Sequence, residues 1–196
     1  SWAAGNIPYL VLPARFGLEA VASLRAAFNF VMPVLQVFSA LGSVILPALV
    51  QARAAGRLRR TTLTVLALYG GMALGYGAAM VLFVGPASGF VYGNNYPNLA
   101  PIALALAALP LPAAATSVLG GALRALERPR AVFWAYLSST FASATLGVGL
   151  ILTLGTIGAA TSMALVSAMT ASVCFLLLRR HLRGSAALGS ESAVGA

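Results

Sequence analysis

Residues 16–51, FGLEAVASLRAAFNFVMPVLQVFSALGSVILPALVQ, decide the fold because they are almost all apolar. A run of this length and composition predicts a helix that crosses a membrane, since a span needs about 20 apolar residues. Polar side chains nevertheless recur along the run. On a helix with about 3.6 residues per turn they fall on one face. They are Arg25, Asn29, Gln36, Ser39 and Ser43, with Met32 among them.

The opposite face of this helix is apolar throughout and suits either lipid or a packed core. An arginine in hydrocarbon costs roughly 3 kcal/mol or more, so the polar face is predicted to meet protein or a water-filled cavity. Its candidate substrate-binding residues are Arg25, Asn29, Gln36 and Ser43. In the alternative, Arg25 lies close enough to the membrane surface for its guanidinium group to reach water. The apolar face carries Ala27, Phe30, Val31, Val34, Phe38, Leu41, Ile45 and Leu49.

The composition also indicates a membrane protein. Of the 196 residues, 60% are hydrophobic and 8% are charged, whereas a soluble domain carries about 25% charged residues. The formal net charge of +9 comes from twelve basic residues, all of them arginine. They lie beside the ends of apolar runs and form no basic stripe with exposed aromatics, which favours membrane topology over nucleic-acid binding. The single cysteine, Cys174, lies in an apolar run and is interpreted as a core residue.

Five apolar runs are predicted to span the membrane, at about residues 18–50, 62–84, 99–123, 131–154 and 157–178. The first is longer than a hydrocarbon core of about 30 Å requires, so it should tilt, protrude or kink at Pro33 or Pro47. Residues 1–16 are too short to span alone, and we expect them to end a preceding helix of a longer protein. The prediction is therefore an all-α integral membrane domain over residues 1–183, followed by a disordered tail at 184–196.

Small residues predict where helices approach one another closely. Gly71 and Gly75 have GxxxG spacing, and Ser139, Ser143 and Gly147 repeat every four residues along the fourth span. Such residues let helix backbones come into contact.

Other features divide the middle of the chain. Tyr69 and Tyr76 lie on one face of the second span and would either line a cavity or pack. The uncharged segment 85–101, rich in Gly, Asn and Pro, predicts turns. Pro110 and Pro112 are expected to break the third span.

The arginines predict the orientation. Four of them separate the first two spans, three separate the third and fourth, and three follow the fifth, whereas the other two loops have none. Because arginine-rich loops stay in the cytoplasm, these loops and the C-terminus are predicted to be cytoplasmic.

Few residues in the chain are suited to catalysis. The three carboxylates are Glu19, Glu127 and Glu191, and no two of them can be placed together in a membrane cavity for acid–base work. One histidine and one cysteine do not make a usual metal site, and a P-loop is impossible without lysine. We therefore expect no enzyme, metal site or cofactor in this chain, and the kinked, polar helices suit a carrier.

Several segments follow one another in a familiar order: GLEAVASLRAAFNFVMPVLQVFSALGSVILPALVQA, a basic loop, LFVGPASGFVYGNNYPNLAPIALALAALPL, GALRALERPR and LGTIGAATSMALVS. Gly17, Pro47, Tyr92-Gly93 with Tyr96, and Gly158-Ala159-Ala160 mark this order. The chain thereby resembles the C-terminal half of bacterial polysaccharide (O-antigen) flippases, of the multidrug/oligosaccharidyl-lipid/polysaccharide exporter superfamily.

The resemblance implies a carrier with two six-helix lobes around a central cavity. This chain would supply five full helices and the end of a sixth, which is most of one lobe. The implied activity is the movement of an undecaprenyl-diphosphate-linked oligosaccharide across the bacterial inner membrane by alternating access. The partners would be this substrate, membrane lipids and a missing N-terminal lobe. Arg25 would then meet the diphosphate, and Glu19 would be the one candidate for ion coupling.

Three alternatives stay open. A multidrug and toxin extrusion antiporter would export an organic cation and would want an acidic residue in its cavity, which the polar face around Arg25 lacks. A lipid II flippase is a close relative. From a different class, a non-transporting membrane scaffold would hold a polysaccharide synthesis complex together.

Overall fold

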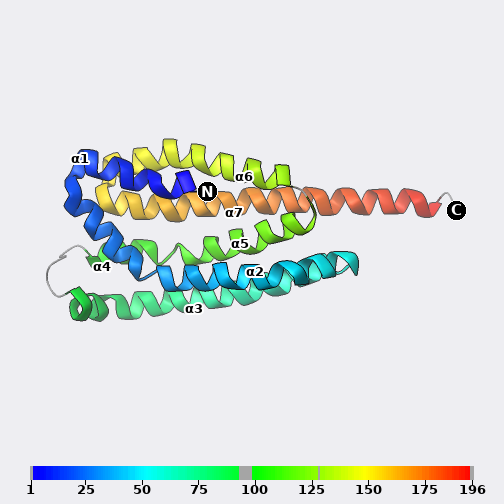
Figure 1. Ribbon diagram of the computed structural model, residues 1–196, viewed down its shortest axis with the longest axis horizontal. Helices are drawn as coiled ribbons and strands as arrows, with labels where there is room; N and C mark the ends of the chain where they lie inside the picture. The colour runs from blue at the N-terminus through cyan, green and yellow to red at the C-terminus, as the bar shows by residue number, and fades with distance from the viewer. Residues whose placement is uncertain (1, 93–98, 128, 195–196) are drawn as a thin grey trace.

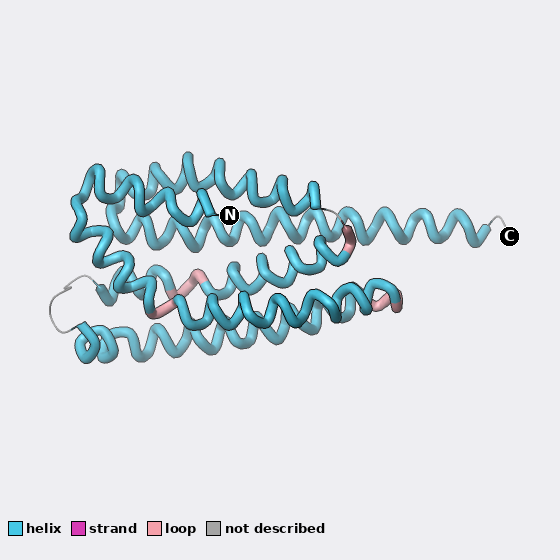
Figure 2. The backbone as a smooth tube through the Cα atoms, viewed as in Figure 1, coloured by secondary structure: helices cyan, strands magenta, loops and turns pink. Residues whose placement is uncertain are grey.

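The computed structural model describes residues 2–92, 99–127 and 129–194, and the side chains within them except those of 2–5, 91, 129, 131 and 182–194. The described chain is almost entirely helical and has no strand (Figure 1, Figure 2). In chain order the elements are α1 (Trp2–Asn29), α2 (Met32–Ala54), α3 (Leu58–Tyr92), α4 (Leu99–Leu106), α5 (Pro110–Ala125), α6 (Pro129–Ala142), the π-helix η1 (Ser143–Gly147) and α7 (Val148–Val194).

Five helical stretches of the described chain are long and apolar enough to cross a membrane. They are Asn6–Asn29, Met32–Ala54, Leu58–Phe90, Leu99–Ala125 and Val132–His181. By the length and apolarity of these helices the chain is a multi-pass, all-α membrane protein, which confirms the predicted class.

Gly17 reverses the chain within α1. Its φ of 80° and ψ of 174° lie outside the helical region, in a part of conformational space that only glycine occupies readily. Tyr9 and Arg25 lie at equal sequence distances on either side of it, and the guanidinium carbon of Arg25 is 5.9 Å from the centre of the Tyr9 ring. The two segments of α1 therefore run back along each other, and residues 2–16 are separate from the run that begins at residue 18 (Figure 1).

Gly155 makes a similar reversal within α7, with φ 61° and ψ −132°. Just beyond it, Gly158 lies so close to the carbonyl group of Leu150 that a Cβ atom at this position would overlap it. Residues 132–154 and 156–181 therefore form a tight helical hairpin, visible as the α6–α7 pair in Figure 1.

The first predicted span, 18–50, differs from the structure because it is broken at residues 30–31. Pro33 has no N–H to donate to the carbonyl group of Asn29, so the regular helical pattern cannot continue there. The amide groups of residues 30 and 31 instead bond to carbonyl groups three residues back, at 3.2 and 2.9 Å. The hydroxyl group of Tyr76 in α3 donates a hydrogen bond to the Phe30 carbonyl group at this break. Pro47 lies inside α2 without ending it.

The apolar face predicted for the first span is buried or half-buried in the structure at all eight of its positions. Phe38 is 2% exposed, and its ring stacks on that of Tyr69 in α3 with centroids 5.2 Å apart. Tyr69 and Tyr76 therefore pack within the bundle, which settles the choice between packing and lining a cavity.

The glycine contacts differ from those predicted from GxxxG spacing. Gly71 and Gly75 are exposed, and a Cβ atom at either position would have no neighbouring atom within 4 Å. The predicted close contact at this pair is therefore wrong within this chain. The close approach on α3 is at Gly77, where a Cβ atom would lie 3.1 Å from the carbonyl oxygen of Ala107.

Two element boundaries differ from expectation and one agrees with it. α3 continues as a helix to Tyr92, so residues 85–92 are not turns, and Pro86 removes one hydrogen bond without ending the helix. Residues 93–98, which include Tyr96, lie outside the described residues. The third span is broken between Leu106 and Pro110, as its prolines predicted. The backbone of α7 continues as a helix to Val194 through most of the segment expected to be disordered.

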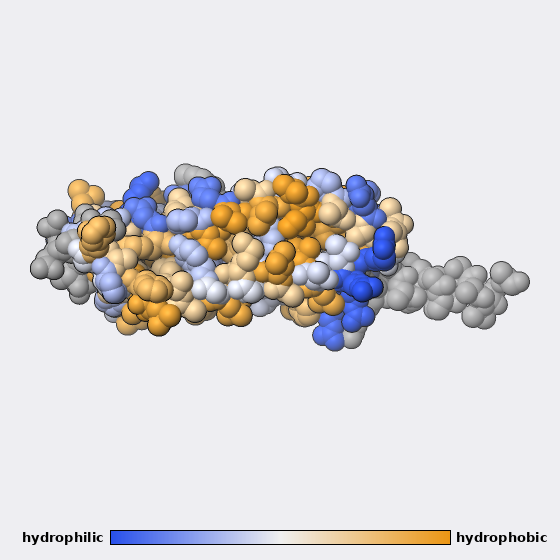
Figure 3. Space-filling model, turned by 90° about the horizontal axis from the view of Figure 1, so that it is seen from below, coloured by the Kyte–Doolittle hydropathy of each residue, from blue (hydrophilic) through white to orange (hydrophobic). Residues whose placement is uncertain are grey.

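The connections that carry arginine gather at one end of the bundle, which we call the arginine-rich end. The α2–α3 turn and the α5–α6 junction both lie there, while the reversal in α1 and the start of the α7 return lie at the other end (Figure 1). Hydrophilic surface covers this end near the α2–α3 turn, beside largely hydrophobic flanks (Figure 3). The structure thus places the arginine-rich connections on one side, with Arg15 and Arg25 near the Gly17 reversal at the other end. Which side of a membrane the arginine-rich end faces stays a prediction.

Candidate functional site: a hydroxyl-lined cavity

A cavity of about 750 Å³ lies between α2, α5, α6, η1 and α7. Its wall is apolar in part, with Phe38 and Val166 among the lining residues, but polar groups from all of these elements reach it. The polar lining residues are Ser39, Ser43, Thr116, Ser117, Arg124, Tyr136, Ser139, Ser143, Ser162, Ser167 and Thr170.

Small side chains on two antiparallel helices make one wall of this cavity. Ser139, Ser143 and Gly147 are buried, and a Cβ atom at Gly147 would lie 3.8 Å from the Cβ atom of Ser162. This confirms that the small-residue face predicted from their spacing packs against a neighbouring helix. Ser143, which lines the cavity, begins the π-helical turn Ser143–Gly147, and such turns change the backbone hydrogen-bond pattern locally.

Several of the lining hydroxyl groups donate their hydrogen bonds backwards into their own helices. Ser139 donates to the Tyr136 carbonyl oxygen at 2.9 Å, Ser162 to that of Ala159 at 2.8 Å, and Thr170 to that of Val166 at 2.8 Å. A hydroxyl group that donates in this way keeps oxygen lone pairs with which it can accept. The cavity wall therefore offers acceptors to a ligand that carries hydroxyl or other donor groups.

Thr116 connects the α5 wall of the cavity to the α7 wall. Its hydroxyl group lies 2.9 Å from the carbonyl oxygen of Pro112 and 3.4 Å from that of Ser167. Because one donor is shared between two helices, it holds these two walls at a defined separation.

Arg124 supplies the one cationic side chain among the residues that line this cavity. It belongs to the last turn of α5 and therefore lies towards the arginine-rich end. The negative end of the helix dipole at this turn stabilises its positive charge. Its side chain is exposed and makes no ion pair with a described carboxylate. The guanidinium group is thus open to an anionic ligand.

Of the four residues predicted from sequence to bind substrate, only Ser43 lines this cavity. Arg25 is exposed beside Tyr9, and Asn29 is exposed with its side-chain amide 3.3 Å from the hydroxyl group of Tyr92. Gln36 is exposed on α2. The break at residues 30–31 interrupts the helix between Asn29 and Gln36, so the predicted face does not continue along one cylinder.

Sequence reasoning missed the largest part of the cavity lining. Sequence reasoning places Arg124 among the three arginines between the third and fourth spans, and it does not single out the hydroxyl groups on α7. The signal was nevertheless present: Ser162, Val166 and Thr170 recur every fourth residue, which places them on one helix face. Ser139 and Ser143 follow the same spacing on the preceding span.

The described residues contain no group of three His, Cys, Asp or Glu side chains that could hold a metal ion. The cavity lining has hydroxyl groups and one guanidinium group but no carboxylate or imidazole. The arrangement is suited to hydrogen bonding of a neutral polar ligand and to binding of an anion, and not to acid–base work between paired groups.

In comparisons with known proteins, no protein-family model matches the chain, and none of the curated proteins does so either.

Proposed function

We propose that this chain forms most of one lobe of a two-lobe carrier that moves an undecaprenyl-diphosphate-linked oligosaccharide across the bacterial inner membrane by alternating access. The observation that carries the proposal is the cavity, which combines many hydroxyl groups with one arginine and no carboxylate. An oligosaccharide presents hydroxyl groups that both donate and accept hydrogen bonds. A diphosphate presents anionic oxygens, which a guanidinium group binds and a carboxylate would repel.

In this proposal the two chemical parts of the substrate meet two parts of the cavity. The sugar hydroxyl groups donate to acceptor oxygens such as those of Ser139, Ser162 and Thr170. The diphosphate lies towards the arginine-rich end, where Arg124 can donate two parallel hydrogen bonds to it. The volume of about 750 Å³ is within the range of about 300–1,000 Å³ typical of ligand sites.

The exposed polar face of α1 and α2 extends the proposed path. Ser43 lies both on this face and in the cavity wall. In the proposal a second lobe covers the face, so that Arg25, Asn29 and Gln36 line the remainder of a central cavity. Arg25 follows the Gly17 reversal, at the end of the bundle opposite the arginine-rich end. In the proposal the diphosphate leaves Arg124 as the substrate crosses and meets Arg25 at this second end.

The alternatives predict different cavities. An exporter of organic cations would place a carboxylate in the wall, and none lines this one. A scaffold needs no polar cavity within its helices, so the buried hydroxyl groups would have no role.

The proposed orientation of this carrier has the arginine-rich end in the cytoplasm.

The test is polysaccharide export in a strain that lacks the gene, at matched membrane levels of each variant. The triple variant Ser139→Ala/Ser162→Ala/Thr170→Val removes three cavity acceptors worth about 0.5–1.5 kcal/mol each, so export should fall at least about tenfold. The control Ser138→Ala/Ser172→Ala removes hydroxyl groups that also donate backwards, at 2.8 and 2.9 Å, but are exposed outside the cavity.

The control should export within about twofold of wild type. Wild-type export from the triple variant would remove the cavity from the substrate path. If the strain without the gene shows no accumulation of lipid-linked oligosaccharide in the cytoplasmic leaflet, the flippase function itself is wrong.

A further inference from the structure

A second pocket, of about 560 Å³, opens between α2 and α3 at the arginine-rich end. Gln51 of α2, Arg57 of the connecting turn, and Arg60, Thr61 and Thr64 of α3 supply its polar wall. Its apolar side is formed by Ala48, Ala52 and Val65. It is separate from the hydroxyl-lined cavity, with which it shares no lining residue.

The charge of this pocket is not balanced by the described part of the chain. Arg57 and Arg60 are exposed, and neither makes an ion pair with a described carboxylate. The carboxylate of Glu127, at the same end of the bundle, is already within 3.0 Å of Arg53. The two guanidinium groups are therefore available to an anion from outside the described chain.

The backbone adds to the positive potential. α3 begins at Leu58, and the amide group of Thr61 donates to the Arg57 carbonyl oxygen at 3.1 Å. The amide groups before Thr61 precede this first helical hydrogen bond, and they point out of the helix start towards the same end as the two arginines. The Thr61 hydroxyl group and the Gln51 side-chain amide lie beside the guanidinium groups as further donors suited to phosphate oxygens, whereas the Thr64 hydroxyl group already donates to the Arg60 carbonyl oxygen at 3.1 Å.

Apolar surface lies directly beyond the pocket. Leu68 is one helical turn after Thr64, and Val44 is one turn before Ala48, which also lines the pocket. Their side chains are 60% and 70% exposed. A ligand with a phosphate group at one end and hydrocarbon at the other would therefore match both surfaces, whereas a free anion would use only the first.

We propose that this pocket binds the phosphate headgroup of an anionic phospholipid from the membrane leaflet at the arginine-rich end, with an acyl chain lying along Leu68 and Val44. Two guanidinium groups neutralise the phosphodiester, and the apolar surface of α2 and α3 receives the chain. The site is a place for a bound lipid at one interface, and it does not depend on what the hydroxyl-lined cavity carries.

The test is lipid binding to the purified chain in detergent, measured by native mass spectrometry with phosphatidylglycerol as the probe. The double variant Arg57→Gln/Arg60→Gln should lower phosphatidylglycerol binding at least about tenfold, the expected loss of charge-assisted contacts. The matched control is Arg59→Gln, because Arg59 is exposed between the same two residues but does not line the pocket. It should bind within about twofold of wild type.

Two further arms separate the possible sources of the phosphate. Millimolar inorganic phosphate should leave phosphatidylglycerol bound, and Leu68→Ser should weaken phosphatidylglycerol binding several-fold because it removes the acyl contact. Displacement by inorganic phosphate would identify a free-anion site and overturn the proposal. An equal loss in Arg59→Gln would indicate general surface charge, and an unchanged double variant would show that the pocket does not bind the lipid; either result also overturns it.

Discussion

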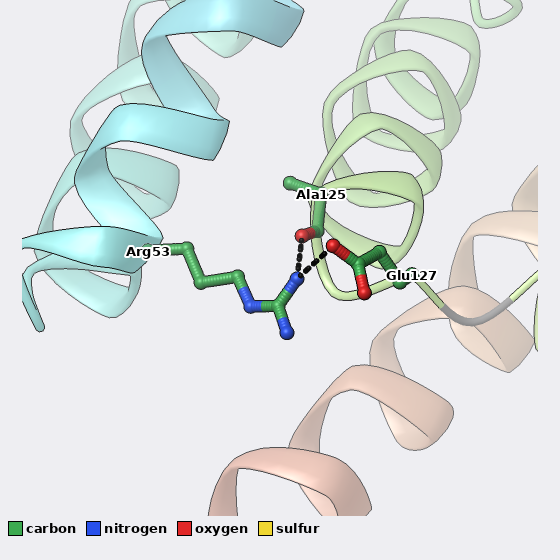
Figure 4. A network of polar contacts seen from close by, with 3 residues as sticks. All are labelled: Arg53, Ala125 and Glu127. Carbon is green, nitrogen blue, oxygen red and sulfur yellow. Dashed lines mark hydrogen bonds and ion pairs between the residues drawn. The ribbon is translucent and has the colours of Figure 1, made fainter.

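The Nη1 atom of Arg53 lies 3.0 Å from Oε1 of Glu127 and 2.9 Å from the carbonyl oxygen of Ala125 (Figure 4). One guanidinium nitrogen thereby links the last turn of α2 to the end of α5. Leu49, Leu58 and Ala125 form a small buried cluster at the same junction. Because Ala125 is the last residue of α5, its carbonyl group lacks a helical partner, and the arginine supplies one.

This double role predicts unequal effects for the two partners. Their side chains are 39% and 82% exposed, so the ion pair alone should contribute about 0.2–1 kcal/mol. Glu127→Gln should cost no more than that, whereas Arg53→Ala should cost about 1–2 kcal/mol because the Ala125 carbonyl group also loses its donor. Thermal unfolding of both single variants and the double variant in detergent gives the coupling between them. Equal costs for the two single variants would contradict the capping role.

Tyr76 and Tyr69 of α3 allow a matched test of the break at residues 30–31, because only the Tyr76 hydroxyl group bonds to it. Tyr76→Phe removes the hydroxyl group that donates to the Phe30 carbonyl group, and should destabilise the protein by about 1–3 kcal/mol. The Tyr69 hydroxyl group is buried without a hydrogen-bond partner, so Tyr69→Phe should be neutral or stabilising while the ring stack on Phe38 is kept. Unfolding in detergent would measure both, and a larger loss at Tyr69 would contradict this assignment.

The α6–α7 hairpin predicts a large effect from one methyl group. Gly158→Ala would push a Cβ atom into the backbone carbonyl group of Leu150, which cannot move aside as a side chain would. We expect a loss of more than about 3 kcal/mol, the upper end of ordinary overpacking, and a low yield of folded protein in the membrane. Gly75→Ala is the control, because its Cβ would meet no atom within 4 Å, and it should be neutral or stabilising through helix propensity. Similar yields for both variants would mean that the hairpin is less tight than described.

The gathering of the arginine-rich connections at one end predicts which sites an impermeant thiol reagent reaches. In a background with Cys174→Ala, single cysteines would replace the exposed residues Glu19 and Ala55. Glu19 directly follows the Gly17 reversal and Ala55 begins the α2–α3 turn, and these two features lie at opposite ends of the bundle (Figure 1). Intact cells should be labelled at residue 19 and not at residue 55, and both should react after permeabilisation. The reverse pattern would place the arginine-rich end outside the cell.

The two arginines of the proposed path predict separate losses of export. Arg124→Ala and Arg25→Ala each remove a charge-assisted contact worth about 1.5–3 kcal/mol, so each should lower export about ten- to a hundredfold at matched protein levels. Arg25→Lys should recover only part, since lysine offers a point charge in place of the guanidinium fork. Arg130→Ala, at an exposed position outside the cavity, should leave export near wild type.

Export at the wild-type level from Arg25→Ala would support the alternative in which Arg25 reaches the membrane surface. It would leave the Arg124 result to decide the role of the hydroxyl-lined cavity.

Local pattern was enough to predict the fold class and the buried face of the first span. Phe38 and Leu49 lie in the core because they follow helical spacing within an apolar run. It was not enough for the break at residues 30–31. Pro33 and Pro47 have the same local chemistry, yet only the first is next to a break, where Tyr76 of another helix satisfies a backbone carbonyl group.

The candidate site is less predictable than the fold, because local sequence pattern does not specify which helices meet. Ser43 was found because it lies on the polar face of one helix, and Ser139 and Ser143 were recognised only as a packing face. That these side chains meet Ser162 and Arg124 around one cavity depends on how α2, α5, α6 and α7 pack.

The sequence by itself determined an all-α, membrane-spanning chain with its arginines beside the ends of apolar runs, because hydrophobic length and charge placement act within single segments. Only the tertiary structure decided which small residues touch and which polar groups share a cavity. Gly71 and Gly75 have the spacing of a contact and make none with the part of the chain that the structure describes, whereas Gly147 meets Ser162 across the hairpin. Contact between two helices depends on their relative rotation and separation, and these follow from the packing of the whole bundle.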